Sequence, residues 1–260
     1  MESPQQALAC AYRAILSDVP KHWFDQSRVE DPEYSKLSGL FLPGTSDAYR
    51  DAGQRIMVVG RETRAWNVVN PTAPFIGLDD YIQRAMTKQQ GFLTKALELP
   101  QDKGASFFNF LRALARDHGK ESIAWANLFS LSWDGKSPMQ WEHFHELRKI
   151  SERLLKTQIK ILEPDVIVFA NGASSARYRQ VYFPHKGESS VCSRLADYRD
   201  EGVPIGQLWR FHLYDSISCF RIQHPSSISV GARAARQRLL EELRSSPPAR
   251  AKCEAADPSL

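Results

Sequence analysis

The sequence predicts an α/β protein, folded as a three-layer α/β/α sandwich with a central, mostly parallel sheet. Short apolar runs of strand length, the clearest at residues 55–59, 122–128 and 166–169, alternate with longer segments whose apolar residues recur at helical spacing. Strands separated by helices favour parallel pairing, because a parallel crossover needs about a dozen residues or more. Helices are expected to cover both faces of such a sheet.

The chain is expected to contain one main domain with extensions at both ends. Residues 1–50 are predicted to form an N-terminal cap or extension, because residues 5–18 have helical spacing and the stretch after them is interrupted by Pro and Gly but rich in aromatic residues. The main α/β/α domain is assigned to residues 51–244. Residues 245–260 are polar and contain Pro, so we expect a disordered tail.

The helices follow from apolar periodicity and from capping residues. Asp79 can cap a helix that ends near residue 98, and the loop before it, residues 66–78, contains Pro and Gly and could line a pocket. Further helices are expected at residues 106–117, 139–161 and 231–244, and two short late strands at residues 205–213 and 216–222.

Composition limits the classes of protein to which the chain can belong, but it does not identify a binding partner. A net charge of +4 is compatible with a polyanion but does not indicate one. The four cysteines form no C-x2-C pair, and His143 and His145 point to different sides of a predicted helix, so we expect no metal and no cofactor. The sequence has neither a run of ~20 apolar residues nor the pattern of a signal peptide. We therefore expect a cytoplasmic protein with free thiols and no membrane contact, and a monomer.

Two segments place chemically active side chains just after apolar runs. The run at residues 55–59 is followed by Gly60, Arg61 and Glu62, and a later run by His224 and a short polar loop. In open α/β sheets, ligands bind outside the carboxyl ends of the strands. A carboxylate and an imidazole at such positions indicate a hydrolytic site.

These segments resemble the two signature motifs of the uracil-DNA glycosylase superfamily. The first is similar to the family's Gly-Gln-Asp-Pro-Tyr type loop, and His224-Pro225-Ser226-Ser227-Ile228-Ser229 is similar to its His-Pro-Ser-Pro-Leu-Ser type loop. Three further segments resemble family landmarks in the same order: residues 106–111, 123–128 and 164–170. The resemblance covers roughly residues 55–242.

The resemblance implies a monofunctional DNA glycosylase that flips out a modified pyrimidine and hydrolyses its N-glycosidic bond without a metal. Glu62, at the position of the family's Asp, would hold the water and stabilise the sugar cation, and His224 would donate to the base oxygen that gains charge. Asn127 would read the base edge. Phe75, or alternatively Trp66, would stack on the base, with core packing as the alternative for both.

The same resemblance assigns DNA contacts to the second motif. The hydroxyl groups of Ser226 and Ser229 would donate to phosphates, and Ser227 is counted among the DNA-binding residues of the same loop. Ile228 would enter the base stack as the nucleotide flips out. Arg233, in the basic final helix, would contact phosphates. The alternatives are an ordinary loop anchor for Ile228 and a solvated helix face for Arg233.

The sequence departs from the family after Glu62. The uracil-specific branch has a Pro-Tyr pair whose Tyr excludes pyrimidines substituted at C5, and this chain has Thr63-Arg64. The change favours a larger base, near which Gly60, Arg61 and Arg64 would form part of the base-binding loop. Solvated charge is the alternative for both arginines. A related branch in anti-phage defence removes glucosylated hydroxymethylcytosine, which suggests that substrate here.

Three other functions stay open at this point. The first is uracil excision in base excision repair. The second is a non-catalytic DNA-binding protein that senses flipped bases, and the third is a hydrolase of free nucleosides. In the leading interpretation the partner is DNA that contains a modified base.

Overall fold

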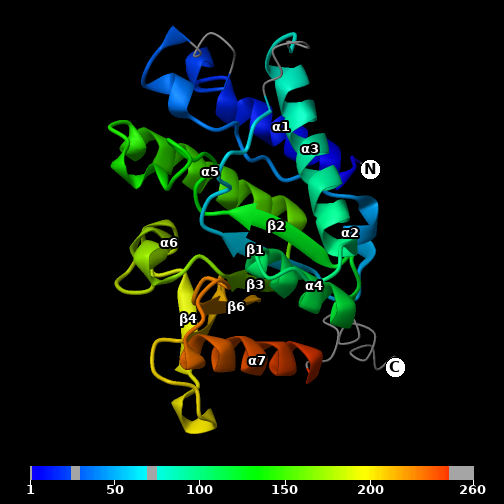
Figure 1. The fold of residues 1–260 in the computed structure, drawn as a ribbon, viewed down its shortest axis with the longest axis vertical. Helices are drawn as coiled ribbons and strands as arrows, with labels where there is room; N and C mark the ends of the chain where they lie inside the picture. The colour runs from blue at the N-terminus through cyan, green and yellow to red at the C-terminus, as the bar shows by residue number, and fades with distance from the viewer. Residues whose placement is uncertain (1, 25–29, 69–74, 246–260) are drawn as a thin grey trace, which may run out of the picture. The chain divides into compact units, whose positions relative to one another are not determined.

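The computed structural model describes residues 2–24, 30–68 and 75–245, so most of the predicted tail lies outside the described residues. The α/β class is confirmed: a six-stranded, mostly parallel central sheet is flanked by helices (Figure 1). The strands are β1 (Ile56–Gly60), β2 (Ile123–Asn127), β3 (Val166–Phe169), β4 (Cys192–Asp197), β5 (Leu208–Leu213) and β6 (Ile217–Ile222). The α-helices are α1 (Pro4–Leu16), α2 (Asp47–Asp51), α3 (Leu78–Glu98), α4 (Ser106–His118), α5 (Phe144–Leu162), α6 (Ala176–Tyr182) and α7 (Val230–Ser245).

The strand order is β2-β1-β3-β6-β5-β4, with parallel pairing of β1 with β3 and of β3 with β6. Strands β5 and β4 extend the sheet in antiparallel fashion. Strand β2 runs parallel to β1, because Ile56 N–H donates to Ser122 O before β2 begins and Phe129 N–H donates to Arg61 O after both strands end, each at 2.8 Å. Every residue of β1, β2 and β3 is buried, as is usual for parallel strands covered on both faces.

The chain divides into two compact units. The first comprises Met1–Asp47, Arg61–Leu93 and Ala126–Leu162, and the second comprises Ala48–Gly60, Thr94–Trp125 and Glu163–Leu260. The sheet, apart from the end of β2, belongs to the second unit.

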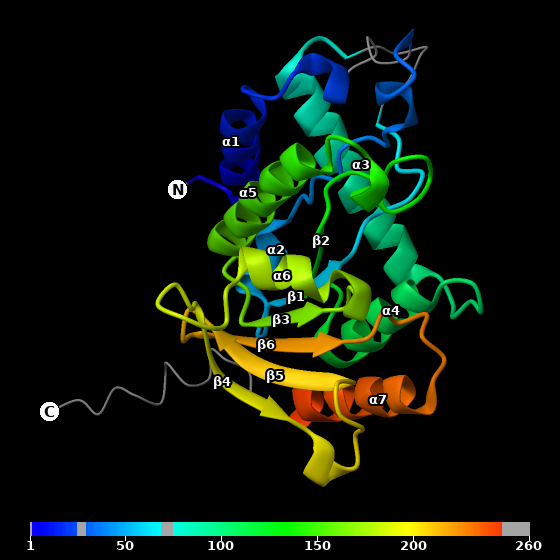
Figure 2. The same ribbon diagram turned by 90° about the vertical axis from the view of Figure 1, so that its left-hand side faces the viewer.

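In the second unit, α6 and α7 cover opposite faces of β5 (Figure 2). Arg210 of β5 forms an ion pair with Glu242 of α7, with Nη1 and Oε1 3.0 Å apart. The next strand residue, Phe211, has the Arg179 guanidinium of α6 over its ring, 5.0 Å from the centroid. Neighbouring residues of a strand point to opposite faces. The two helices and the strand between them are therefore three layers, consistent with the predicted sandwich.

In the first unit, α1 packs against α5 (Figure 1). Helix α1 begins with a capping box, in which Ser3 Oγ accepts from Gln6 N–H at 3.2 Å and Gln6 Oε1 accepts from Ser3 N–H at 3.1 Å. The fully buried Tyr12 hydroxyl donates to Pro43 O at 2.9 Å and so fixes the segment after the helix.

Several predicted boundaries were wrong. Helix α5 begins at Phe144, not near 139, because a separate 3₁₀ turn at Pro138–Gln140 precedes it. Helix α3 begins at Leu78, so Asp79 lies inside its first turn instead of capping it. The sequence analysis did not predict α2, α6 or β4. None of the helices in the described segments is both long and apolar enough to cross a bilayer.

Candidate functional site

The two motif loops follow strands of the parallel part of the sheet. Strands β1 and β6 are both parallel to β3, which lies between them, so Gly60 and Ile222 end at the same edge of the sheet. This is the edge at which open α/β sheets bind ligands. We call residues 61–64 the Glu62 loop and residues 223–229 the His224 loop. They belong to the first and second unit respectively, and the predicted pairing of Glu62 with His224 stays a prediction.

Two arginines of its own loop hold the Glu62 carboxylate. The Glu62 side chain is 2% exposed, and its Oε2 accepts from Arg61 Nε at 2.6 Å. Its Oε1 accepts from Arg61 Nη2 at 2.9 Å and from Arg64 Nε at 3.4 Å. The contact with Arg61 is bidentate, the arrangement that a guanidinium and a carboxylate prefer. Both predicted base-binding arginines, Arg61 and Arg64, therefore contact the Glu62 carboxylate.

Asn127, the last residue of β2, is buried and its amide is engaged by its neighbours. Hydrogen bonding assigns the amide oxygen to the side of Thr63, where Oδ1 accepts from the main-chain N–H at 3.2 Å and from the hydroxyl at 2.6 Å. Nδ2 donates to Ala126 O at 3.0 Å. These bonds tie the Glu62 loop to the end of β2. They favour a positioning role, because Asn127 would have to exchange them in order to read a base.

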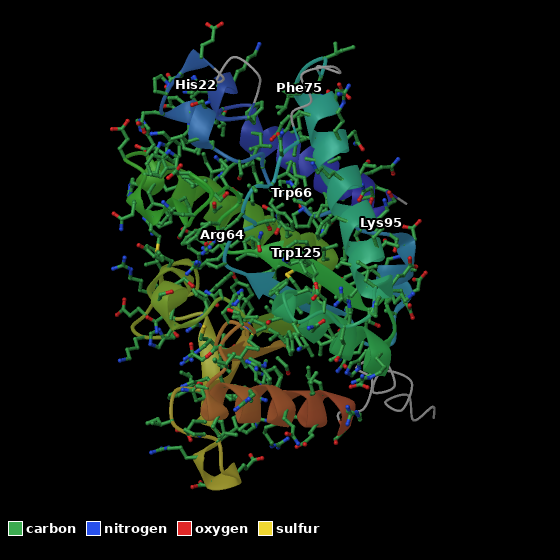
Figure 3. The ribbon with its side chains drawn as sticks, in the orientation of Figure 1. His22, Arg64, Trp66, Phe75, Lys95 and Trp125 are labelled. Carbon is green, nitrogen blue, oxygen red and sulfur yellow. The ribbon has the colours of Figure 1, made fainter. Side chains whose placement is uncertain are left out.

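The two aromatic candidates differ in their surroundings (Figure 3). Trp66 is 5% exposed, and its indole N–H donates to Leu40 O at 3.2 Å while its ring packs edge-on against Phe92 at 5.8 Å. Trp66 is thus a core residue, which favours the packing alternative. Phe75 is half-buried beside the start of α3, 4.9 Å from the Tyr81 ring. Phe75 therefore remains a better candidate than Trp66 for stacking on a base.

Neighbours within the second unit fix the position of His224: Ser226 and Phe107 contact its imidazole, and Gly172 lies against its main chain. Its Nδ1 accepts from Ser226 N–H at 3.2 Å and lies 2.7 Å from Ser226 Oγ. The half-buried Phe107 ring of α4 lies nearly parallel to it at 6.0 Å. Gly172, in the loop after β3, has φ +78°, and a Cβ there would lie 3.6 Å from His224 Cβ. The positive φ favours glycine, and the packing places the loop after β3 against the main chain and Cβ of His224.

The remaining residues of the His224 loop organise the start of α7. Ser229 Oγ accepts from Ala232 N–H at 3.2 Å, which caps the helix, and Ser227 O accepts from Arg236 Nη1 at 3.0 Å. Between these fixed points, Ile228 is 83% exposed. An apolar side chain presented to solvent by an anchored loop suits insertion into a partner. Arg233 is exposed on α7.

The sequence analysis missed two residues of this site. Phe107 was covered there only as part of the predicted helix at residues 106–117, and Asn171 was not singled out. Asn171 is 1% exposed, its Nδ2 donates to Ser175 Oγ at 3.0 Å, and its Oδ1 has no hydrogen-bond partner among the described residues. The Asn-Gly pair directly after a buried strand was the available signal for Asn171.

The comparisons do not identify the chain. No protein-family model matches it, and no curated protein does. Within the described part of the chain, no group of three or more His, Cys, Asp or Glu side chains is arranged to hold a metal ion.

Proposed function

We propose that this protein is a monofunctional DNA glycosylase that flips out a modified pyrimidine and hydrolyses its N-glycosidic bond. Breaking that bond develops positive charge on the sugar and negative charge on the departing base. In the proposal, the Glu62 carboxylate faces the sugar cation and orients the attacking water, and the His224 imidazole donates a hydrogen bond to the base oxygen. The product is an abasic site.

The observation that carries the proposal is the fixed tautomer of His224. A main-chain N–H can only donate, so the bond from Ser226 N–H makes Nδ1 an acceptor. A neutral imidazole with an acceptor at Nδ1 carries its proton on Nε2. His224 is then a ready hydrogen-bond donor with an orientation set by Ser226 and Phe107. Such a preorganised donor stabilises an oxyanion without reorganisation during the reaction.

The loops suit a larger base than uracil. Arg64 stands where the uracil-specific family has an excluding Tyr side chain, and Thr63, at the position of the family's Pro, is turned toward Asn127. Arg64 is 57% exposed, and its 3.4 Å contact with Glu62 is the longest in that cluster. It can leave this contact at little cost and donate to hydroxyl groups on an enlarged base. These features support glucosylated hydroxymethylcytosine, and hence anti-phage defence, over uracil repair.

The Glu62 geometry also favours a second candidate, a non-catalytic DNA-binding protein that senses flipped bases. Both carboxylate oxygens are occupied by guanidinium groups. Turnover requires one of these bonds to yield to a water, whereas a binding protein would keep them.

Glu62→Gln separates the two candidates. The control is Glu146→Gln, an exposed residue of α5 outside both loops. For an enzyme, we expect E62Q to lose base excision by about 10²- to 10⁴-fold, with DNA binding retained and E146Q unchanged. Equal excision by E62Q and E146Q would remove Glu62 from the chemistry. Binding without excision by the wild-type chain, on every base tested, would favour the sensor.

A further inference from the structure

Helix α6 carries a buried guanidinium that the proposed chemistry does not use. Arg179 is 8% exposed, and its guanidinium carbon lies 5.7 Å from the ring centroid of Phe169 in β3 and 5.0 Å from that of Phe211 in β5. The two rings are themselves nearly parallel, 6.0 Å apart. The aromatic faces orient the guanidinium through cation–π contacts, but they carry no opposing charge.

Arg179 has no anionic partner within the described segments. No carboxylate among those residues acts on its charge, and its buried Nε–H has no hydrogen-bond partner among them. The nearby Cys192 and Cys219 do not supply the charge, because burial raises the pKa of both thiols and keeps them neutral. A buried charge without a partner is strongly unfavourable. An anion from outside the chain would relieve this cost.

A second guanidinium lies on the same face of the sheet. Arg221 of β6 is paired in register with Phe169, and Cys219, two residues earlier on the same face, is paired with Phe211. Arg221 is therefore next to the two rings that Arg179 covers. Arg221 Nη1 donates to Gly206 O at 2.5 Å, and a guanidinium has further N–H donors.

The pKa shifts of neighbouring groups are consistent with the Arg179 and Arg221 guanidinium groups lying close together. Burial lowers the pKa of Arg221, and the charge of Arg179 lowers it further. The half-buried His185, just after α6, has its pKa lowered by burial and then by the same Arg179 charge. The guanidinium groups of Arg179 and Arg221 thus converge in the second unit, and the His185 imidazole lies close enough to respond to the Arg179 charge.

We propose that Arg179 and Arg221 form a binding site for a phosphate-class oxyanion. Guanidinium groups bind such oxyanions through paired, charge-assisted hydrogen bonds. The oxyanion can be a small free phosphate compound or a phosphodiester of bound DNA. The site adjoins the His224 loop, because Ala173 N–H, just before α6, donates to Gln223 Oε1 at 3.3 Å. The inference does not rest on the proposed glycosylase activity.

Thermal unfolding of the full-length chain tests the site, with inorganic phosphate as the probe and NaCl used to hold ionic strength and pH constant. The variants are Arg179→Met and, as a matched control, Arg177→Met, an exposed arginine of the same helix whose guanidinium stacks on Tyr178. The unfolding temperatures of wild type and R177M should rise with phosphate and saturate. In R179M, phosphate affinity should fall by about tenfold or more, as expected for a lost charge-assisted bond.

Without phosphate, R179M should unfold at the same temperature as wild type or higher, because the substitution removes an unpaired buried charge. Arg221→Met provides a second variant, in which the phosphate-dependent rise should also shrink. The proposal is overturned if wild type gains no stability up to about 50 mM phosphate, well above a millimolar Kd. It is equally overturned if R179M and R221M show the same rise as R177M.

The source of the oxyanion follows from a second titration, with duplex DNA that contains no modified base. Weaker DNA binding by R179M, together with competition by inorganic phosphate, identifies a DNA phosphodiester. Unchanged DNA binding with lost phosphate binding identifies a small phosphate compound. Neither measurement involves base excision, so failure of this proposal and failure of the proposed function are distinguishable.

Discussion

The ion pair between Arg55 and Asp165 gives the most quantitative prediction about the stability of the sheet. It joins the residue before β1 to the residue before β3. Asp165 Oδ2 accepts from Arg55 N–H at 2.8 Å and from Nε at 3.2 Å, and Oδ1 accepts from Nη2 at 3.0 Å. In return, Arg55 O accepts from Asp165 N–H at 2.9 Å. We expect Asp165→Ala to destabilise the sheet strongly.

The size of the expected loss of stability follows from the burial of both side chains. The Arg55 and Asp165 side chains are only 14% and 15% exposed. Removing one partner of a buried pair costs about 3–5 kcal/mol, because the other charge is left uncompensated. Glu163, 3.6 Å from Arg55 Nη1, compensates in part but is itself 75% exposed. We therefore expect a loss of about 3 kcal/mol, the lower end of that range.

Urea unfolding measures this loss. With an m-value of about 3 kcal/mol/M for a chain of this size, the midpoint should fall by about 1 M. The control is Asp51→Ala, which breaks an exposed pair with Arg50 and should change stability by less than about 0.5 kcal/mol. The double substitution Arg55→Met, Asp165→Leu should recover much of the loss, since no unpaired charge remains.

The reasoning is refuted if Asp165→Ala and Asp51→Ala unfold at the same urea concentration. It is also refuted if the double variant is less stable than Asp165→Ala. That second result would show that the loss comes from packing and not from the uncompensated Arg55 charge.

Four further predictions concern single side chains. Ser226→Ala removes the 2.7 Å contact with the imidazole but keeps the main-chain bond, so single-turnover excision should fall about tenfold with an unchanged melting temperature. Ile228→Ser should leave stability within about 0.5 kcal/mol, because Ile228 is exposed, but should weaken DNA binding in a gel shift. Tyr12→Phe leaves a main-chain acceptor unpaired and should cost about 1–2 kcal/mol in urea unfolding. Burial lowers the pKa of the His118 imidazole in the folded chain below its unfolded value of 6.5. Between these two pKa values the unfolded chain binds more protons than the folded chain, so the free energy of unfolding should increase with pH up to about 6.5. His118→Gln should flatten that increase in urea titrations at several pH values.

The parts of the fold that the sequence predicted are those in which burial alone determines the pattern. Strands β1 and β3 are continuous apolar runs, and every residue in them is buried. Strand β4 was missed because it lies at the sheet edge, where Arg194 and Leu195 are exposed and no alternation of apolar residues remains. The start of α5 was misplaced because helical spacing does not distinguish a 3₁₀ turn from the helix that follows it.

The site was less predictable than the fold, because residue types do not specify partners. The motif positions of Glu62 and His224 could be read from the sequence. The bidentate bond from Arg61 to Glu62 and the ties between Asn127 and Thr63 depend on loop geometry, which no spacing pattern reveals. The same limit applies to Trp66, because its indole N–H donates to the main-chain oxygen of Leu40, 26 residues earlier in the chain.

The most direct test of the central claim is base excision by the wild-type chain. Matched duplexes containing glucosylated hydroxymethylcytosine, hydroxymethylcytosine or uracil are incubated with the protein, treated with alkali and resolved on a denaturing gel. The account predicts strand breaks at the modified position of the glucosylated duplex, and none when His224→Ala replaces wild type. Intact strands from all three duplexes, from protein that still binds them, would contradict it.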